Sequence, residues 1–263
     1  MTAMRDVKEF DELYARLEDM KKRAVRGEIG ISAFLSPREL YYAKAYLARS
    51  GAEYLEYGGY PDAERKRLYM LPEYMDGVED IKALGEYGEE AGICAISAKG
   101  SGFCNLSHRD FMGSLLGLGI ERSVIGDIAL TDENSAVVFC DIKISDFLLN
   151  EWREVGHDRI KCARIGGDDI VLPERRYSQI SDTVASARLD CVVAALCNLA
   201  RERARTCVVS ELCELDYECE TRPDREVSAP ALITVRGYGK FRVLSIGGQT
   251  KKGRYRLEAQ KFL

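Results

Sequence analysis

The sequence predicts an α+β protein of three small units, and three observations support this. Apolar residues recur at helical spacing near the N-terminus, strand-like and helix-like runs alternate in the middle, and two helical stripes precede short strand-like runs at the C-terminus. The predicted units cover residues 1–75, 76–168 and 183–263. At 263 residues and 46% hydrophobic composition, the chain can bury a core in each unit.

The N-terminal unit is predicted to contain two helices and a short strand. Apolar residues at helical spacing, with charged residues between them, predict a helix over residues 6–26. The Ser-Pro-Arg-Glu sequence at residues 36–39 supplies an N-cap, a proline for the first turn and an acid. The second helix therefore starts there and ends at the Ser-Gly pair of residues 50–51. A strand follows over 53–57, and a boundary is expected near 72–80.

The middle unit alternates its elements in the order β-α-β-β-α-β, the plan of ferredoxin-like folds and RNA-recognition modules. The predicted elements are strands over residues 93–98, 123–130, 136–140 and 158–164 and helices over residues 108–118 and 144–153. This order hosts many unrelated activities. The strand over 136–140 has one aromatic residue, Phe139, and no basic residue, so a surface that stacks bases is not expected.

The C-terminal unit is predicted to have two helices packed on a small β-sheet. A glycine-containing hinge at residues 165–169 and a polar segment to Ser181 precede it. Helical stripes run from Leu189 to Leu199 and from Ala204 to Val208. The strand-like runs cover residues 212–218, 232–235, 241–246 and 254–257.

The net charge of -5 is unevenly distributed along the chain. Residues 183–263 contain 14 Lys and Arg against 10 Asp and Glu, or +4, which leaves -9 for residues 1–182. Between Val227 and Leu257 there are seven basic residues and no acid. An acidic protein with a basic end can bind nucleic acid through that end, so the total charge does not exclude RNA as a partner.

Three arginines crowd the second helix of this basic unit: Arg201, Arg203 and Arg205. Arg201 and Arg205 lie four residues apart and share a face, where a nearby anion would offset their repulsion. Guanidinium groups suit phosphate, although a solvated basic face explains the helix about as well. The loop over residues 236–241 adds two glycines, basic groups and a tyrosine that looks exposed, which favours a phosphate and base contact.

These residues resemble a known family. Arg188-Leu189-Asp190, then residues 199–204, then a strand and residues 235–241 are similar to the S4-type RNA-binding domain, over roughly residues 183–263. Upstream, residues 58–67, 108–120 and 250–254 resemble the bacterial YlmH family, so the resemblance spans nearly the whole chain.

The resemblance implies an RNA-binding protein that associates with the large ribosomal subunit. A cytoplasmic location is expected because the sequence has neither a signal-peptide core nor a membrane helix, and the protein is expected to act without catalysis. Its implied partners are ribosomal RNA and peptidyl-tRNA, its role is quality control of stalled translation, and its gene lies among cell-division genes. The RNA-binding candidates carried over are Arg188, Arg201, Arg203, Arg205, Arg236, Tyr238, Lys240, Lys251, Lys252 and Arg254. Asp190 is expected to orient an arginine, and Arg65-Lys66-Arg67 is a candidate second RNA contact.

Four features depart from the S4 pattern. Ala200 stands where the family has a helix-capping serine, and Glu211 and Asp216 replace a glycine and an asparagine around the first strand. The Ser-Ala-Pro-Ala sequence of residues 228–231 replaces a Gly-Asp turn. The two acids place negative charge near the expected RNA face. We therefore expect weaker RNA affinity than in a typical S4 domain.

No catalytic, metal-binding or cofactor site is predicted. Nine cysteines form an odd set without a C-x-x-C pair, so reduced thiols are expected. The His108-Arg109-Asp110 sequence is explained by a helix N-terminus, because no nucleophile with a paired base is evident. No apolar run approaches the ~18 residues of a membrane helix, and neither a membrane nor a small-molecule substrate is expected.

Two alternative functions remain. The chain could be an RNA-modifying enzyme that uses an S4-type domain for targeting, but residues 1–182 look too short for the large catalytic domain of pseudouridine synthases. It could also be a cell-division adaptor that binds protein through its acidic part.

Overall fold

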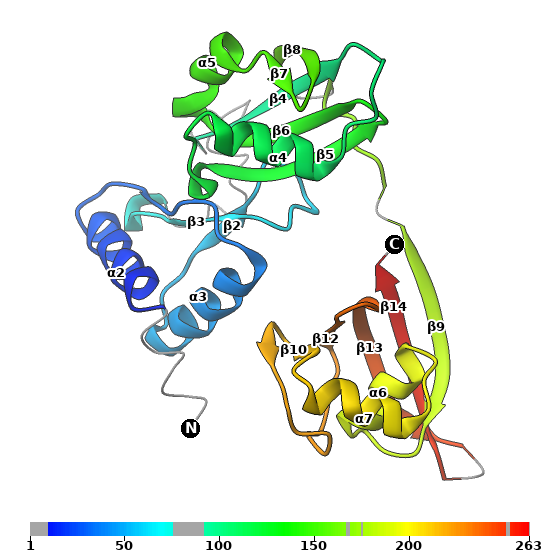
Figure 1. Cartoon of the computed structure of the whole chain (residues 1–263). Helices are drawn as coiled ribbons and strands as arrows, with labels where there is room; N and C mark the ends of the chain where they lie inside the picture. Colours follow the sequence, from blue (N-terminus) through cyan, green and yellow to red (C-terminus); the bar gives the residue numbers. More distant parts are fainter. Residues whose placement is uncertain (1–9, 76–91, 167–168, 175, 251–252, 263) are drawn as a thin grey trace. The chain divides into compact units, whose positions relative to one another are not determined.

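A computed structural model describes residues 10–75, 92–166, 169–174, 176–250 and 253–262. The chain folds into two compact units, Met1–Pro173 and Glu174–Leu263 (Figure 1). The first unit holds the predicted units 1–75 and 76–168 together, and the second begins earlier than residue 183. The predicted boundary near 72–80 lies mostly outside the described residues. No helix within the described ranges is long and apolar enough to cross a membrane.

Two amphipathic helices open the first unit. Helix α2 (Asp11–Val25) packs its buried stripe against α3 (Pro37–Ser50), and both contribute to one apolar cluster. Ser36 and Glu39 form a reciprocal capping box at the start of α3, and Gly51 ends the helix with a left-handed φ of 62°. The second predicted helix is confirmed. The first predicted helix, over residues 6–26, is confirmed from Asp11 to Val25, and residues 6–9 lie outside the described part of the chain.

A small antiparallel sheet lies beside these helices. It consists of β1 (Gly30–Ile31), β2 (Leu55–Tyr57) and β3 (Arg67–Met70), in the order β1-β3-β2. A single-turn helix, η1 (Glu73–Met75), follows. All four residues of β3 are buried, because the strand is central and is covered on both faces.

A five-stranded sheet completes the first unit, and its elements have the predicted order. They are β4 (Ile93–Gly100), α4 (His108–Gly117), η3 (Arg122–Val124), β5 (Ile125–Asp132), β6 (Ser135–Asp141), α5 (Ile142–Glu151), β7 (Glu154–Val155) and β8 (Asp158–Ile165). The strands are antiparallel in the order β5-β6-β4-β8-β7. Helices α4 and α5 pack on one face, around the fully buried Phe111 and the buried Trp152.

The opposite face of this sheet is covered by the N-terminal segment of the same unit. Phe139 on β6 is fully buried, and the ring of Tyr60 stacks on it with centroids 4.9 Å apart. Phe34 belongs to the same cluster. Gly59 has a φ of 102°, and a Cβ atom there would lie 2.3 Å from the Phe139 ring, so only glycine fits this approach. The expectation that this strand offers no base-stacking surface is therefore confirmed.

The candidate RNA contact Arg65-Lys66-Arg67 serves the fold instead. Arg65 is 9% exposed and donates to three backbone carbonyls, those of Ile125, Phe34 and Arg122. Arg67 is 4% exposed and bonds Asp141, while Lys66 pairs with Glu56 at 3.1 Å. The triplet does not form an exposed basic strip, because its backbone runs along the junction between the segment and the sheet.

The second unit contains two helices and a six-stranded antiparallel sheet. Its elements are β9 (Tyr177–Val184), α6 (Leu189–Leu196), α7 (Arg201–Val209), β10 (Cys213–Leu215), β11 (Glu218–Cys219), β12 (Ala231–Val235), β13 (Gly239–Gln249) and β14 (Tyr255–Phe262). The strand order is β11-β10-β12-β13-β14-β9. Both helices lie over the same face of this sheet (Figure 1) and share its core. The sequence does not predict β9, which pairs with β14 along its whole length.

Candidate nucleic-acid interface

Helix α7 presents the arginine cluster of the second unit. Its buried residues, Ala204, Cys207 and Val208, face the core, so the opposite side of the helix faces outward. Arg203 and Arg205 are exposed, and neither forms an ion pair with any residue that the structure describes. These two guanidinium groups are therefore available to an external anion.

Asp190 connects this helix to α6. Its carboxylate is 2% exposed and accepts hydrogen bonds from Arg188 at 3.1 and 3.2 Å. It also pairs with Arg201, whose Nε and Nη2 lie 3.1 and 3.0 Å from Oδ2. The backbone N–H of Cys191 donates a further bond at 2.9 Å. The prediction that Asp190 orients an arginine is confirmed, and it orients two.

The electrostatics of this cluster leave an excess of positive charge. Burial alone would raise the pKa of Asp190, but hydrogen bonds from Arg188 and Arg201 outweigh it and lower this pKa. The same bond raises the pKa of Arg188. Two guanidinium groups thus share one carboxylate, with a net charge of about +1. The side chains of Arg188 and Arg201 remain 42% and 54% exposed, so both can contact a ligand while held in place.

The anion that offsets the repulsion between Arg201 and Arg205 is supplied by the protein. The sequence allowed a bound phosphate to fill this role, but Asp190 already occupies the position beside Arg201. Arg205 has no such partner within the described residues.

The turn between β12 and β13 lies beside the segment that follows α7. The N–H of Arg236 donates to the carbonyl of Leu212 at 2.8 Å, and the Arg236 side chain is exposed. Gly237 takes a φ of 85°, which the turn requires. Tyr238 is half-buried and packs against the apolar core, so it is not the exposed ring that the sequence predicts.

Two further candidates that the structure describes, Lys240 and Arg254, do not lie on the helices. Lys240 alternates with the buried Phe241, so it lies on the sheet face opposite the helices, with its ammonium 5.1 Å from the centre of the Phe262 ring. Arg254 donates to the Thr183 hydroxyl at 2.9 Å and to the carbonyl of the same residue. Lys251 and Lys252 lie outside the described residues. The eight predicted residues that the structure describes therefore do not form one patch.

The sheet face opposite the helices also carries a cluster that the sequence did not predict. The guanidinium of Arg242 lies 5.3 Å from the Phe262 ring, and Tyr177 packs edge-on against that ring at 5.2 Å. The alternation of basic and buried residues along β13 was a usable signal for Arg242. No comparable signal linked Tyr177 to Phe262, because their strands lie at opposite ends of the unit's sequence.

The three single-residue departures from the S4 pattern have distinct structural roles. Ala200 is the N-cap of α7, and no side chain caps that end. Glu211 and Asp216 both adopt left-handed φ values, 59° and 49°. Asp216 also accepts a hydrogen bond from the N–H of Leu232 at 2.8 Å. The family's glycine and asparagine suit such conformations better.

Other groups of residues that could suggest a catalytic or metal-binding site have structural explanations. Asp110 caps α4 in a reciprocal box with Ser107, which accounts for its place in the His108-Arg109-Asp110 sequence. All nine cysteines are free thiols, and only Cys104 and Cys219 are exposed. Within the described ranges, no three His, Cys, Asp or Glu residues gather as metal ligands would.

Comparison with known proteins places most of the chain in one family. Residues 9–75 match a family model described as "YlmH, N-terminal", and residues 92–168 match one described as "Putative RNA-binding domain in YlmH". Together these models cover more than half of the chain.

Two individual proteins are similar over long stretches. The ribosome-associated protein quality control protein P2 of Bacillus subtilis (strain 168) is 27% identical over 231 residues, which are 88% of this chain and 86% of that protein. The structure of the cell division protein ylmH from Streptococcus pneumoniae is 19% identical. It matches 61% of this chain and 91% of its own, with a TM-score of 0.49. The two matched domains and the long relative establish that this chain belongs to the YlmH family.

Proposed function

We propose that this protein binds RNA on the ribosome, and specifically ribosomal RNA of the large subunit, in the quality control of stalled translation. The name of its Bacillus relative and the RNA-binding description of residues 92–168 support the coarser role. The S4-like resemblance of the C-terminal unit supports the finer one, including contact with tRNA. The protein acts by binding and not by catalysis.

The observation that carries the proposal is the arginine layer on the helices of the second unit. Asp190 holds Arg188 and Arg201 in fixed orientations, while Arg203 and Arg205 have no ion pair with any described residue. Guanidinium groups on a rigid helix suit phosphate oxygens, and pre-organisation reduces the entropy lost on binding. Such contacts position a protein on RNA without reading its sequence.

Residues 92–168 are proposed to have the ferredoxin-like arrangement. Their antiparallel strand order and the two helices on one face support this. The covered ring of Phe139 excludes base stacking at that position, so RNA contacts of this domain are proposed to be with phosphates.

The test is sedimentation of the full chain with purified large ribosomal subunits. The variant Arg203→Gln/Arg205→Gln removes two exposed charges without touching the Asp190 cluster. If each contributes ~1 kcal/mol, affinity falls about 30-fold. The matched control Arg176→Gln/Arg256→Gln removes two other exposed arginines of the same unit and is expected to bind normally. Equal binding by the arginine-layer variant and the wild type would refute the proposal.

A further inference from the structure

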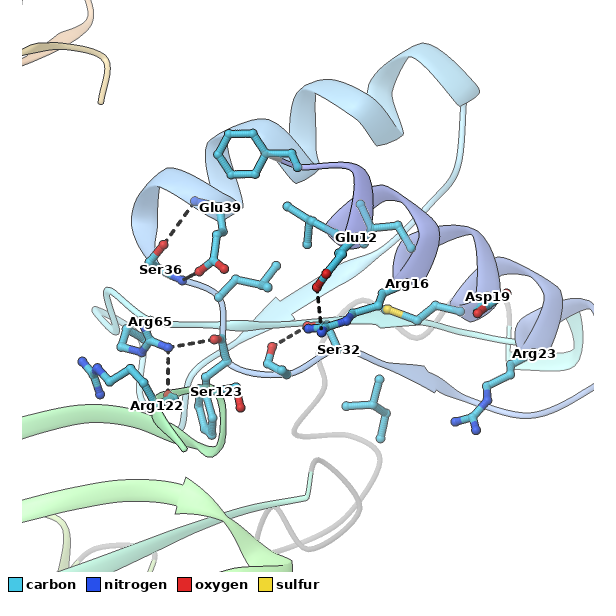
Figure 2. A pocket seen from close by; sticks show the side chains of 18 of the residues that line it. Glu12, Arg16, Asp19, Arg23, Ser32, Ser36, Glu39, Arg65, Arg122 and Ser123 are labelled. Atoms are coloured by element: carbon cyan, nitrogen blue, oxygen red, sulfur yellow. Dashed lines mark hydrogen bonds and ion pairs between the residues drawn. The ribbon is translucent and has the colours of Figure 1, made fainter. Parts of the chain in front are cut away.

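A large pocket lies within the first unit, whereas the arginine layer belongs to the second unit. Its volume is about 1000 Å³, and it is lined by α2, by the segment that leads into α3, and by Arg122 and Ser123 (Figure 2). The family descriptions assign no site to it.

The lining of this pocket is strongly basic, with seven Lys or Arg residues and three Asp or Glu residues. Each acid is already engaged. Glu12 pairs with Arg16 at 3.6 Å, and Asp19 pairs with Lys22 at 3.2 Å. Glu39 accepts a hydrogen bond from the backbone N–H of Ser36, the N-cap residue of α3. The pocket therefore has an excess of cations that its own carboxylates do not neutralise.

Among these cations, Arg122 stands out by its burial and its hydrogen bonding. It is half-buried, forms no ion pair with any described residue, and donates one hydrogen bond, from Nη1 to the Gly126 carbonyl at 3.2 Å. The buried Arg65 lies beside it and donates to the Arg122 carbonyl at 3.1 Å (Figure 2). Burial, followed by the charge of Arg65, lowers the pKa of Arg122 to about 10, and the nearby carboxylate of Asp127 offsets only part of this effect. A further anion here would reduce the repulsion that remains between the two guanidinium groups.

A second group of cations lies at the other end of the pocket. Arg23 on α2 is exposed and, like Arg26, has no ion pair with a described residue. Figure 2 shows Arg23 and the Arg65–Arg122 pair at opposite ends of the view. A single phosphate is too small to contact cations at both ends of a pocket of about 1000 Å³. An anion with repeated phosphates fits this arrangement better.

The pocket offers charge without a stacking surface. Its two aromatic rings, Phe10 and Phe34, are 5% and 2% exposed, so neither can pack against a base. We propose that this pocket binds the phosphodiester backbone of RNA, with Arg122 at one end and Arg23 and Arg26 at the other. The proposal rests on the RNA-binding function proposed above and gives the first unit a contact of its own.

The experiment measures how the affinity of the full chain for ribosomal RNA extracted from Bacillus subtilis depends on salt. Two variants probe the pocket: Arg23→Gln/Arg122→Gln, and Arg23→Gln/Arg26→Gln, which changes only exposed side chains and cannot disturb the core. Each neutralised phosphate contributes about 0.7 to 0.9 to the slope of log K against log salt. Both variants should therefore reduce the slope by about 1.4 to 1.8. The control Arg49→Gln/Arg159→Gln removes two exposed arginines outside the pocket and should leave it unchanged.

The outcomes separate this proposal from the proposed function. Unchanged slopes in both pocket variants, with weakened binding by Arg203→Gln/Arg205→Gln, would overturn the pocket proposal alone. No binding of ribosomal RNA by the wild type would overturn both. Calorimetric titration with inorganic phosphate tests the other source of the same chemistry. Phosphate binding that the pocket variants lose, without any change in their RNA slope, would assign the pocket to a free phosphate ligand and overturn the RNA assignment.

Discussion

Glu211 gives the sharpest test of how the second unit is built. It follows the last turn of α7 with a left-handed φ of 59°. Its N–H donates to the Val208 carbonyl at 3.2 Å, and the N–H of Leu212 donates to the Cys207 carbonyl at 3.0 Å. This pair of bonds is the Schellman ending, whose left-handed position favours glycine. We expect Glu211→Gly to stabilise the unit.

The magnitude follows from two opposing terms. The left-handed conformation costs a residue with a Cβ ~1–2 kcal/mol, and glycine removes that strain. Glycine also raises the conformational entropy of the unfolded chain, which lowers the free energy of unfolding by ~0.4–1 kcal/mol. The net gain is ~0.8 kcal/mol, which for this unit corresponds to a rise in Tm of ~3–6 °C.

Scanning calorimetry of the full chain measures this change, with Glu211→Ala as the matched control. Alanine removes the same charge but keeps the strained backbone, so the difference between the two variants isolates the conformational term. Glu211→Gly should unfold at the higher temperature. If Glu211→Ala proved as stable as Glu211→Gly, the strain attributed to this position would be wrong.

Three further predictions concern other parts of the fold. Asp190→Asn should lower the free energy of unfolding by ~1 kcal/mol at pH 7. Because the folded pKa of Asp190 is lowered, the deficit relative to the wild type should shrink in acid denaturation as the pH falls below ~4 and through that pKa. Gly59→Ala should destabilise the first unit by ~3 kcal/mol in urea unfolding, because its Cβ meets the buried Phe139 ring. Iodoacetamide at pH 8 should label Cys104 before Cys219 by mass spectrometry, since partial burial and nearby acids raise the pKa of the Cys219 thiol.

Local signals in the sequence were sufficient for most helices and for the central strands. The capping residues Ser36 and Glu39 lie within one turn of each other, so their pattern alone sets the start of α3. Strand β9 could not be found in this way. Its outward face is polar and its partner β14 lies about 70 residues later, so no apolar alternation marks it.

The residues of the candidate interface show the same difference between positions set by local sequence and positions set by tertiary contacts. The exposure of Arg203 and Arg205 follows from helical periodicity, because they flank the buried Ala204. The position of Tyr238 depends on a tertiary contact, since its ring packs on a core assembled from both helices and the sheet. The burial of Arg65 also depends on tertiary contacts, because the carbonyls that it bonds come from distant segments, and the sequence alone wrongly predicts an exposed RNA contact there.

The weaker RNA affinity expected from the S4 departures can be assigned to one residue. Asp216 uses its carboxylate to accept the Leu232 N–H, so its charge is partly engaged within the fold. Glu211 is exposed at the end of α7, and its side chain forms no hydrogen bond or ion pair with any described residue. Its charge would therefore oppose the phosphate binding proposed for that helix, with an effect that salt screens. Glu211→Gly and Glu211→Ala should tighten ribosomal RNA binding equally at low salt, and the gain should fade as salt rises. Tighter binding by glycine alone would show that backbone strain, and not charge, weakens the interface.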